Sequence, residues 1–336
     1  MSANQQVLAS LGVSPQFIAI AHGASPYISV YPWSSGFGTR YANPSTLPAG
    51  IGNAVAFNPT VTAIAVAHNT SPNVSVYPWS KGFGTKYANP SSLVPANGRA
   101  VTFNPAGTDI AVAHTSYPYI SVYPWSSGFG TRYTEPSSVP SSVGYGVTFN
   151  PAGTDIAVAH SASPYISVYP WSSGFGTRYA NPSTLPVSYG FGVAFNPEGT
   201  VVAIAHRNSP YISVYPWSSG FGTKYANPSS LPAGRGRGVA FNPEGTALAV
   251  SHETSPYISV YPWSSGFGTK YANPSTLPAT NGYGVDFSPD GKTIAIAAGY
   301  STNTAVYPWS AGFGAKYANP STLPAGSNNG IAFGAA

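Results

Sequence analysis

The stretch YPWSSGFGTRYANP at residues 31–44 occurs seven times in this 336-residue chain, with small changes and no insertion or deletion. Consecutive tryptophans of the series are 46 residues apart throughout. A fixed period of about 40 to 50 residues is typical of a solenoid, a propeller or another repeat array. For the tryptophans we predict a structural role; they are Trp33, Trp79, Trp125, Trp171, Trp217, Trp263 and Trp309.

Each period contains four short runs of alternating residues, separated by turn residues. In the copy that begins at residue 236, the runs are residues 238–241, 247–252, 257–261 and 269–272. Alternation at period two is typical of strands, and four antiparallel strands per repeat form the blade of a β-propeller. The 37 glycines and 34 prolines leave little room for helix. The sequence therefore predicts an all-β protein, a seven-bladed β-propeller of four-stranded antiparallel blades, whose strands we count from first to fourth outward from the axis.

The two ends of the chain indicate how the ring closes. The phenylalanine of the first strand recurs every 46 residues, and its last copy, Phe333, lies beyond the final tryptophan. We expect residues 330–333 to form the innermost strand of the blade whose other strands are residues 17–22, 27–31 and 39–42. The C-terminal strand would then complete the N-terminal blade. This predicts an N-terminal segment at residues 1–14 and a single propeller at residues 15–336.

The faces of each blade differ in bulk. In the second strand Ile64 and Val66 alternate with Ala63, Ala65 and Ala67. A bulky face can therefore pack on the small face of the next blade all the way around the ring. A single blade cannot bury both faces alone, so we expect isolated repeats not to fold.

Composition limits the classes of partner and of chemistry. Lys and Arg number 13 against 8 Asp and Glu, and the net charge of +5 is too small for this length to indicate nucleic-acid binding. The absence of cysteine excludes disulfides, thiolate metal sites and cysteine nucleophiles. We expect no signal peptide and no membrane insertion, because the chain has no basic, apolar leader and no run of about 18 apolar residues. The carboxylates are scattered, without a matched pair or a Ser-His-Asp spacing, so we expect no catalytic residue, no metal and no cofactor.

The repeat resembles that of a known family. Residues 285–291 (VDFSPDG), 294–297 (IAIA) and the ISVY strand at 258–261 are similar to WD40 and related propeller repeats. The resemblance covers nearly the whole chain and implies seven blades. Tyr261-Pro262 stands where the family has its Trp-Asp dipeptide, so the family's Asp-His-Ser-Trp hydrogen-bond network is not implied here. The near-identical Tyr-Pro-Trp-Ser copies also resemble repeat proteins encoded in phage genomes and classed as virion structural components.

Six histidines end the second strand of their repeats, and the seventh copy has Ala298 there. A shared metal ion needs ring nitrogens about 2.0 to 2.1 Å away, whereas equivalent positions of neighbouring blades should lie on the order of 11 Å apart. We therefore expect structural histidines hydrogen-bonded between blades, with a metal or proton site as the alternative. They are His22, His68, His114, His160, His206 and His252.

Two further sets recur once per repeat and are candidate binding residues. Basic residues at the start of the fourth strand either protect an outer edge against pairing or form a basic girdle for an anionic partner. The phenylalanine of the turn at residues 34–38 is either a buried anchor or part of a seven-fold binding surface. The basic set is Arg40, Lys86, Arg132, Arg178, Lys224, Lys270 and Lys316, and the aromatic set is Phe37, Phe83, Phe129, Phe175, Phe221, Phe267 and Phe313.

The loops indicate two unlike ends. The turns after the first and third strands barely change between copies, whereas the loops after the second and fourth strands vary, as at residues 207–208 and 235–237. In a propeller the two variable loops lie at the same end. The nearly symmetric end suits a repeated ligand, and the varied end suits a single asymmetric partner.

From these features we expect a non-catalytic structural or interaction protein. We expect it to be a phage virion component, either a decoration protein or a tail-associated propeller. Its location would be the virion or otherwise the cytoplasm. Its partners would be other virion proteins or host surface glycans, and the sequence does not indicate its oligomeric state. The alternatives are a multivalent carbohydrate-binding lectin and an intracellular WD40-like scaffold for protein–protein interaction.

Overall fold

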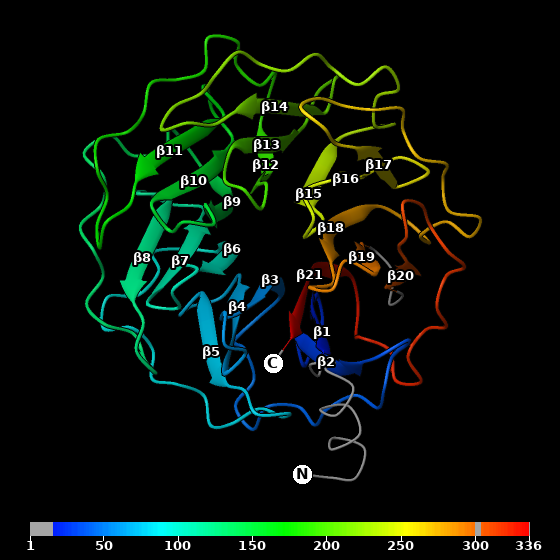
Figure 1. Cartoon of the computed structure of the whole chain (residues 1–336). Helices are drawn as coiled ribbons and strands as arrows, with labels where there is room; N and C mark the ends of the chain where they lie inside the picture. Colours follow the sequence, from blue (N-terminus) through cyan, green and yellow to red (C-terminus); the bar gives the residue numbers. More distant parts are fainter. Residues whose placement is uncertain (1–15, 300–303, 336) are drawn as a thin grey trace.

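Seven small antiparallel sheets stand around a central axis in the computed structural model (Figure 1). The structure describes residues 16–299 and 304–335. Each sheet has an inner, a middle and an outer strand. The predicted seven-bladed β-propeller is confirmed. Within the described ranges no helix is long and apolar enough to cross a membrane.

We number the blades in chain order, so that blade I holds β1, β2 and β21 and blade VII holds β18 to β20. The inner strands of blades I to VII are β21 (Asn328–Ala335), β3 (Gly52–Phe57), β6 (Gly98–Phe103), β9 (Gly144–Phe149), β12 (Gly190–Phe195), β15 (Gly236–Phe241) and β18 (Gly282–Phe287). The middle strands are β1 (Gln16–His22), β4 (Ala63–His68), β7 (Asp109–His114), β10 (Asp155–His160), β13 (Val201–His206), β16 (Ala247–His252) and β19 (Thr293–Ala298). The outer strands are β2 (Ile28–Trp33), β5 (Val74–Pro78), β8 (Ile120–Pro124), β11 (Ile166–Pro170), β14 (Ile212–Pro216), β17 (Ile258–Pro262) and β20 (Ala305–Pro308).

The ring closes as predicted. In blade I the C-terminal strand β21 pairs antiparallel with β1, with Phe333 opposite Ile18 and Ile331 opposite Ile20. The first described residue, Gln16, is paired with Ala335. The two ends of the chain are therefore joined by one sheet. The predicted N-terminal segment, residues 1–14, lies outside the described residues.

The predicted fourth strand is wrong. In blade I the N–H of Gly38 donates to the carbonyl oxygen of Pro32 at 2.9 Å, and the N–H of Tyr41 donates to that of Val30 at 3.0 Å. A regular antiparallel ladder would place the second bond on residue 40, so the register slips by one residue and no ladder forms. What remains in every blade is one bridge, Trp33 to Phe37 in blade I, followed by an extended outer segment.

Bulky faces pack on small faces between neighbouring blades. Between blades II and III, Ala65 and Ala67 of β4 pack against Phe103, Ile110 and other bulky residues of blade III. Each tryptophan lies at such an interface: the Trp79 ring meets Tyr41 of blade I and Phe83 of its own blade edge to face, both at 5.1 Å between centroids. The tryptophans are nearly fully buried at these interfaces, and a structural role for them stays a prediction.

Candidate functional site

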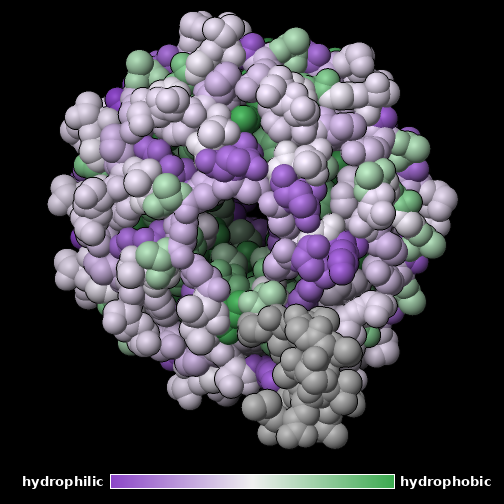
Figure 2. All heavy atoms as spheres, viewed as in Figure 1, coloured by the Kyte–Doolittle hydropathy of each residue, from purple (hydrophilic) through white to green (hydrophobic). Residues whose placement is uncertain are grey.

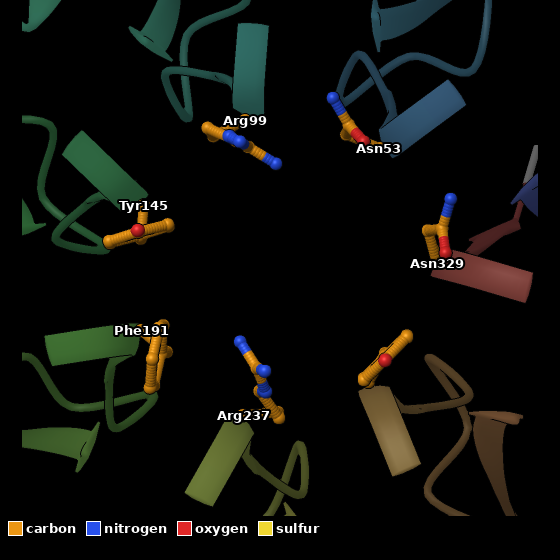
Figure 3. A pocket seen from close by; sticks show the side chains of 7 residues that line it. Asn53, Arg99, Tyr145, Phe191, Arg237 and Asn329 are labelled. Atoms are coloured by element: carbon orange, nitrogen blue, oxygen red, sulfur yellow. The ribbon is translucent and has the colours of Figure 1, made fainter. Parts of the chain in front are cut away.

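One side chain from each inner strand points toward the axis at one end of the propeller (Figure 3). Together the seven side chains line the mouth of a cavity of about 300 Å³. All seven occupy the same position of the 46-residue repeat, the second residue of the inner strand. We call them the funnel ring; its members are Asn53, Arg99, Tyr145, Phe191, Arg237, Tyr283 and Asn329.

A β-bulge in every inner strand presents these side chains. In blade II, Gly52 pairs with His68 and Ala54 pairs with Ala67, which leaves Asn53 without a partner in the ladder. The same skip occurs in the other six blades. A bulge redirects the side chain of the extra residue, here toward the axis rather than onto a blade face.

The residue before the bulge is glycine in six blades. A Cβ on Gly52 would collide with the backbone oxygen of Tyr27 in the neighbouring blade, and Gly282 would bring a Cβ to 2.5 Å from the oxygen of Tyr257. In these six blades only glycine lets the strand approach its neighbour so closely. In blade I this position holds Asn328, whose amide nitrogen donates to Thr304 Oγ1 at 3.1 Å.

The two arginines of the funnel ring differ in their partners. The guanidinium of Arg237 donates through both Nε, at 2.6 Å, and Nη2 to Glu253 Oε1, and it lies 4.3 Å from the ring centre of Phe191. Arg99 has its guanidinium 5.9 Å from the ring centre of Tyr145, and its buried Nε has no hydrogen-bond partner. The funnel therefore holds one guanidinium ready to bind an anion and one that is already paired.

The two asparagines contribute acceptors. Asn53 donates its amide nitrogen to the carbonyl oxygen of Gly98 at 2.7 Å, and Asn329 donates to that of Gly52 at 2.9 Å. Since each nitrogen is bound to the next blade, the amide oxygen is the atom that each offers to a ligand.

Below the funnel ring the wall becomes apolar. Val55, Val147, Val193, Val239, Val285 and Ile331 line the cavity beneath the ring. Figure 2 shows the same change, with hydrophilic residues around the opening and hydrophobic residues within it. A ligand would thus place its polar groups at the ring and its less polar part toward this floor.

Charge is distributed unequally between the two ends. The loops after the middle strands and the outer segments carry Arg207 and Arg235 besides the two ring arginines, against two carboxylates, Glu135 and Glu253. The opposite end carries five carboxylates at the turns between inner and middle strands against two lysines, Lys81 and Lys292; the carboxylates are Asp109, Asp155, Glu198, Glu244 and Asp290. This asymmetry raises the local concentration of anions at the funnel.

The histidines lie elsewhere, fully buried in the blades. His114 Nε2 lies 3.0 Å from Ser121 Oγ on the outer strand, and the equivalent pair recurs in the other five blades that have histidine. The hydrogen bond expected between blades is therefore found within the blade, because the serine faces the ring from the paired strand. Among the described residues no group of three His, Cys, Asp or Glu could hold a metal ion.

Neither candidate binding set lines the funnel. The basic residues are half-buried and lie along their own outer segments, as where Lys224 Nζ donates to Asn227 Oδ1 at 2.5 Å. The phenylalanines are also half-buried: Phe129 meets Trp125 edge to face at 5.1 Å and Tyr123 at 5.4 Å. A binding role for either set stays a prediction.

The sequence carried a signal for the funnel ring. Many positions of the repeat, such as those of the Tyr-Pro-Trp-Ser motif, hold the same residue in all copies, whereas this one holds Asn, Arg, Tyr, Phe, Arg, Tyr and Asn. Variation at one register of a closed ring brings unlike side chains together at the axis, which is how a repeat protein makes an asymmetric site.

Comparison with known proteins supports the fold. No family model matches the sequence, and no curated protein matches it. Among solved structures, a protein provisionally named 6-phosphogluconolactonase from Bacteroides uniformis has a TM-score of 0.70 at 14% identity, covering 95% of this chain and 99% of that one. The periplasmic gluconolactonase of Pseudomonas aeruginosa has a TM-score of 0.69 at 12% identity, covering 95% and 99%. A functionally unknown protein from Desulfotomaculum acetoxidans has 0.69 at 11%, covering 94% and 98%.

These similarities correct the functional prediction made from the sequence. We expected a non-catalytic virion component, a lectin or a scaffold because the propeller is symmetric and its sequence has no local spacing of catalytic residues. The same architecture occurs in proteins named as lactonases, which contradicts the inference from this architecture to a non-catalytic role. At such low identity the similarity shows the fold alone, so the function has to be argued from the funnel.

Proposed function

We propose that the axial funnel binds a small hydroxylated anion of the sugar-acid type and hydrolyses its lactone form. The observation that carries this proposal is Arg99, whose guanidinium lines the mouth of the funnel and makes no hydrogen bond or ion pair with another described residue. A guanidinium without a protein acceptor can donate hydrogen bonds to a carboxylate or carbonyl oxygen of a ligand in the funnel.

The rest of the ring suits a hydroxylated ligand. The amide oxygens of Asn53 and Asn329 accept hydrogen bonds from hydroxyl groups, while Tyr145 and Phe191 offer aromatic surface against a sugar ring. The cavity volume of about 300 Å³ accommodates a molecule of this size.

The choice of a lactone among such ligands is supported by the fold that this chain shares with proteins named as lactonases. In the reaction, the oxygen of a water molecule attacks the lactone carbonyl carbon and the bond from that carbon to the ring oxygen breaks. The ring oxygen takes up a proton and becomes a hydroxyl, and the product is a carboxylate with the release of one proton. Arg99 would donate to the carbonyl oxygen as negative charge develops on it.

The test is acid release from glucono-1,5-lactone, followed by titration at constant pH and corrected for the uncatalysed rate. We expect catalysis by the wild-type chain and a loss of roughly 100-fold in Arg99→Ala, the size typical of a lost donor to a developing oxyanion. Arg207→Ala is the matched control, because Arg207 is exposed outside the funnel against Tyr189.

Two outcomes would contradict this function. A wild-type rate equal to that of buffer would reject lactone hydrolysis, and an Arg99→Ala rate equal to wild type would reject the role of the funnel. Gluconate binding in the absence of hydrolysis, measured by calorimetry, would keep the binding site and reject the reaction.

For the repeat itself we propose a variant of the WD40-like type. The seven blades and the segments 285–291 and 294–297 support this, since they are similar to repeats of that family. The six His-Ser hydrogen bonds join the middle strand to the outer strand, and the tryptophan packs between blades.

A further inference from the structure

Glu253 pairs with one of the two arginines of the funnel ring. It follows the middle strand of blade VI, and its Oε1 accepts from both Nε and Nη2 of Arg237. Its other oxygen lies 3.4 Å from Nη1 of Arg235. The Glu253 side chain is only 22% exposed, so its pairing with Arg237 is weakly screened by solvent.

Stacking holds Arg237 in this arrangement. Its guanidinium lies 4.3 Å from the ring centre of Phe191 and 5.3 Å from that of Tyr283. With two nitrogens on Glu253 and aromatic rings beside it, Arg237 forms part of the wall, and these two donors are not free for a ligand. Arg99, three blades away along the chain, has no carboxylate within ion-pair distance among the described residues.

We infer that the funnel selects ligands with a single negative charge, an aldonate or uronate carboxylate, over phosphorylated sugars, and that Glu253 determines this specificity. This inference rests on the proposed function of the funnel. One unpaired guanidinium matches one carboxylate. A second anionic group on the same ligand would find the Nε and Nη2 donors of Arg237 already bound to Glu253, and it would have to displace that carboxylate to reach them.

The test compares gluconate with 6-phosphogluconate, which differ by one phosphate group, in calorimetric titrations of the wild-type chain and Glu253→Gln. We expect the wild-type chain to bind gluconate about 10-fold more tightly or better. In Glu253→Gln the amide leaves the charge of Arg237 uncompensated, and we expect the affinity ratio to shift toward 6-phosphogluconate by about 10-fold.

Glu244→Gln is the matched control, because it removes the same charge from blade VI at the opposite end of the propeller, where Glu244 accepts from Asn242. It should leave the affinity ratio unchanged. Equal melting temperatures of the two variants would show that both are folded.

A second pair of variants tests directly whether Arg99 contributes more to ligand binding than Arg237. Arg99→Gln should weaken gluconate binding by about 10-fold or more, and Arg237→Gln by clearly less. Equal losses in the two variants, or an affinity ratio that Glu253→Gln leaves unchanged, would overturn the inference while the proposed function stands. Binding of neither ligand by the wild-type chain would reject the proposed function itself.

Discussion

At the scale of single residues, the buried His–Ser pairs show how one polar group constrains its partner. His114 and Ser121 are both buried and lie 3.0 Å apart through Nε2 and Oγ. Blade VII has alanine at both positions, Ala298 and Ala305, so the pair is absent as a unit. A buried donor or acceptor without its partner costs about 1 to 3 kcal/mol, which explains why neither residue is retained alone.

We therefore predict non-additive effects of removing this pair. His114→Ala should lower the free energy of unfolding by about 3 kcal/mol, through the cavity and the unpaired serine hydroxyl. Adding Ser121→Ala should cost nothing further or recover up to about 1 kcal/mol, as measured by guanidinium unfolding in a double-mutant cycle. If the two losses simply add, the hydrogen bond does not couple these residues.

Histidine burial also predicts stability that falls in acid. Desolvation lowers the pKa of five histidines from 6.5 to about 4; they are His68, His114, His160, His206 and His252. The unfolded chain therefore binds more protons between these values, and each histidine removes up to about 1.4 kcal/mol of stability per pH unit as the pH falls through this window.

One buried carboxyl group has the opposite effect on stability as the pH falls. Desolvation raises the pKa of Asp286 from 3.8 to about 7, so this group adds stability as the pH falls from 7 to 4. One carboxyl does not balance five histidines, so guanidinium unfolding should show a steep net loss of stability from pH 6.5 to 4.5. A constant or rising stability over that range would contradict the buried neutral histidines.

At the scale of elements, the bulge of the inner strand determines what the funnel contains. Two glycines flank Tyr283 in β18, but their surroundings differ. A Cβ on Gly282 would lie 2.5 Å from the oxygen of Tyr257 and 2.9 Å from Ser251 Cβ, whereas one on Gly284 would find its nearest atom at 3.5 Å. The first position requires glycine, and the second has room for alanine, which blades II and III carry as Ala54 and Ala100.

We predict that these neighbouring substitutions behave differently. Gly282→Ala should destabilise the chain by about 2 to 4 kcal/mol, because the backbone oxygen of Tyr257 and the Cβ of Ser251 lie too close to the new methyl group. Gly284→Ala should change the free energy of unfolding by less than about 1 kcal/mol. Thermal unfolding of the two variants checks this, and equal destabilisation would show that the close approach at Gly282 does not limit the bulge.

At the scale of the whole molecule, stability depends on closing the ring. Strand β21 supplies Ile331 and Phe333 to the cluster around Trp33, and it completes a blade that otherwise has only β1 and β2. A two-stranded sheet is marginally stable at best, and without β21 blade VII would also lose the face on which it packs.

We predict that a chain ending at residue 327 melts roughly 10 °C or more below the full-length chain and loses cooperativity. A circular permutant is the control: residue 335 is joined to residue 16 by a short linker, and new ends are opened between residues 141 and 142. Because Gln16 and Ala335 are already paired, the permutant should keep a cooperative transition. An unchanged melting temperature of the truncated chain would contradict a role for β21 in closure.

The sequence itself determined the number of blades, the positions of the inner, middle and outer strands and the closure by the C-terminal strand. These features follow from a repeated spacing and from local alternation of residues. Three features were decided by the tertiary structure. The one-residue slip beyond Gly38 ends the ladder where sequence alternation continues, and the histidines bond within their blades. The funnel forms only when seven bulges, 46 residues apart along the chain, meet at one axis. No local spacing encodes that meeting, because side chains so distant in sequence come into contact only through the curvature of the closed ring.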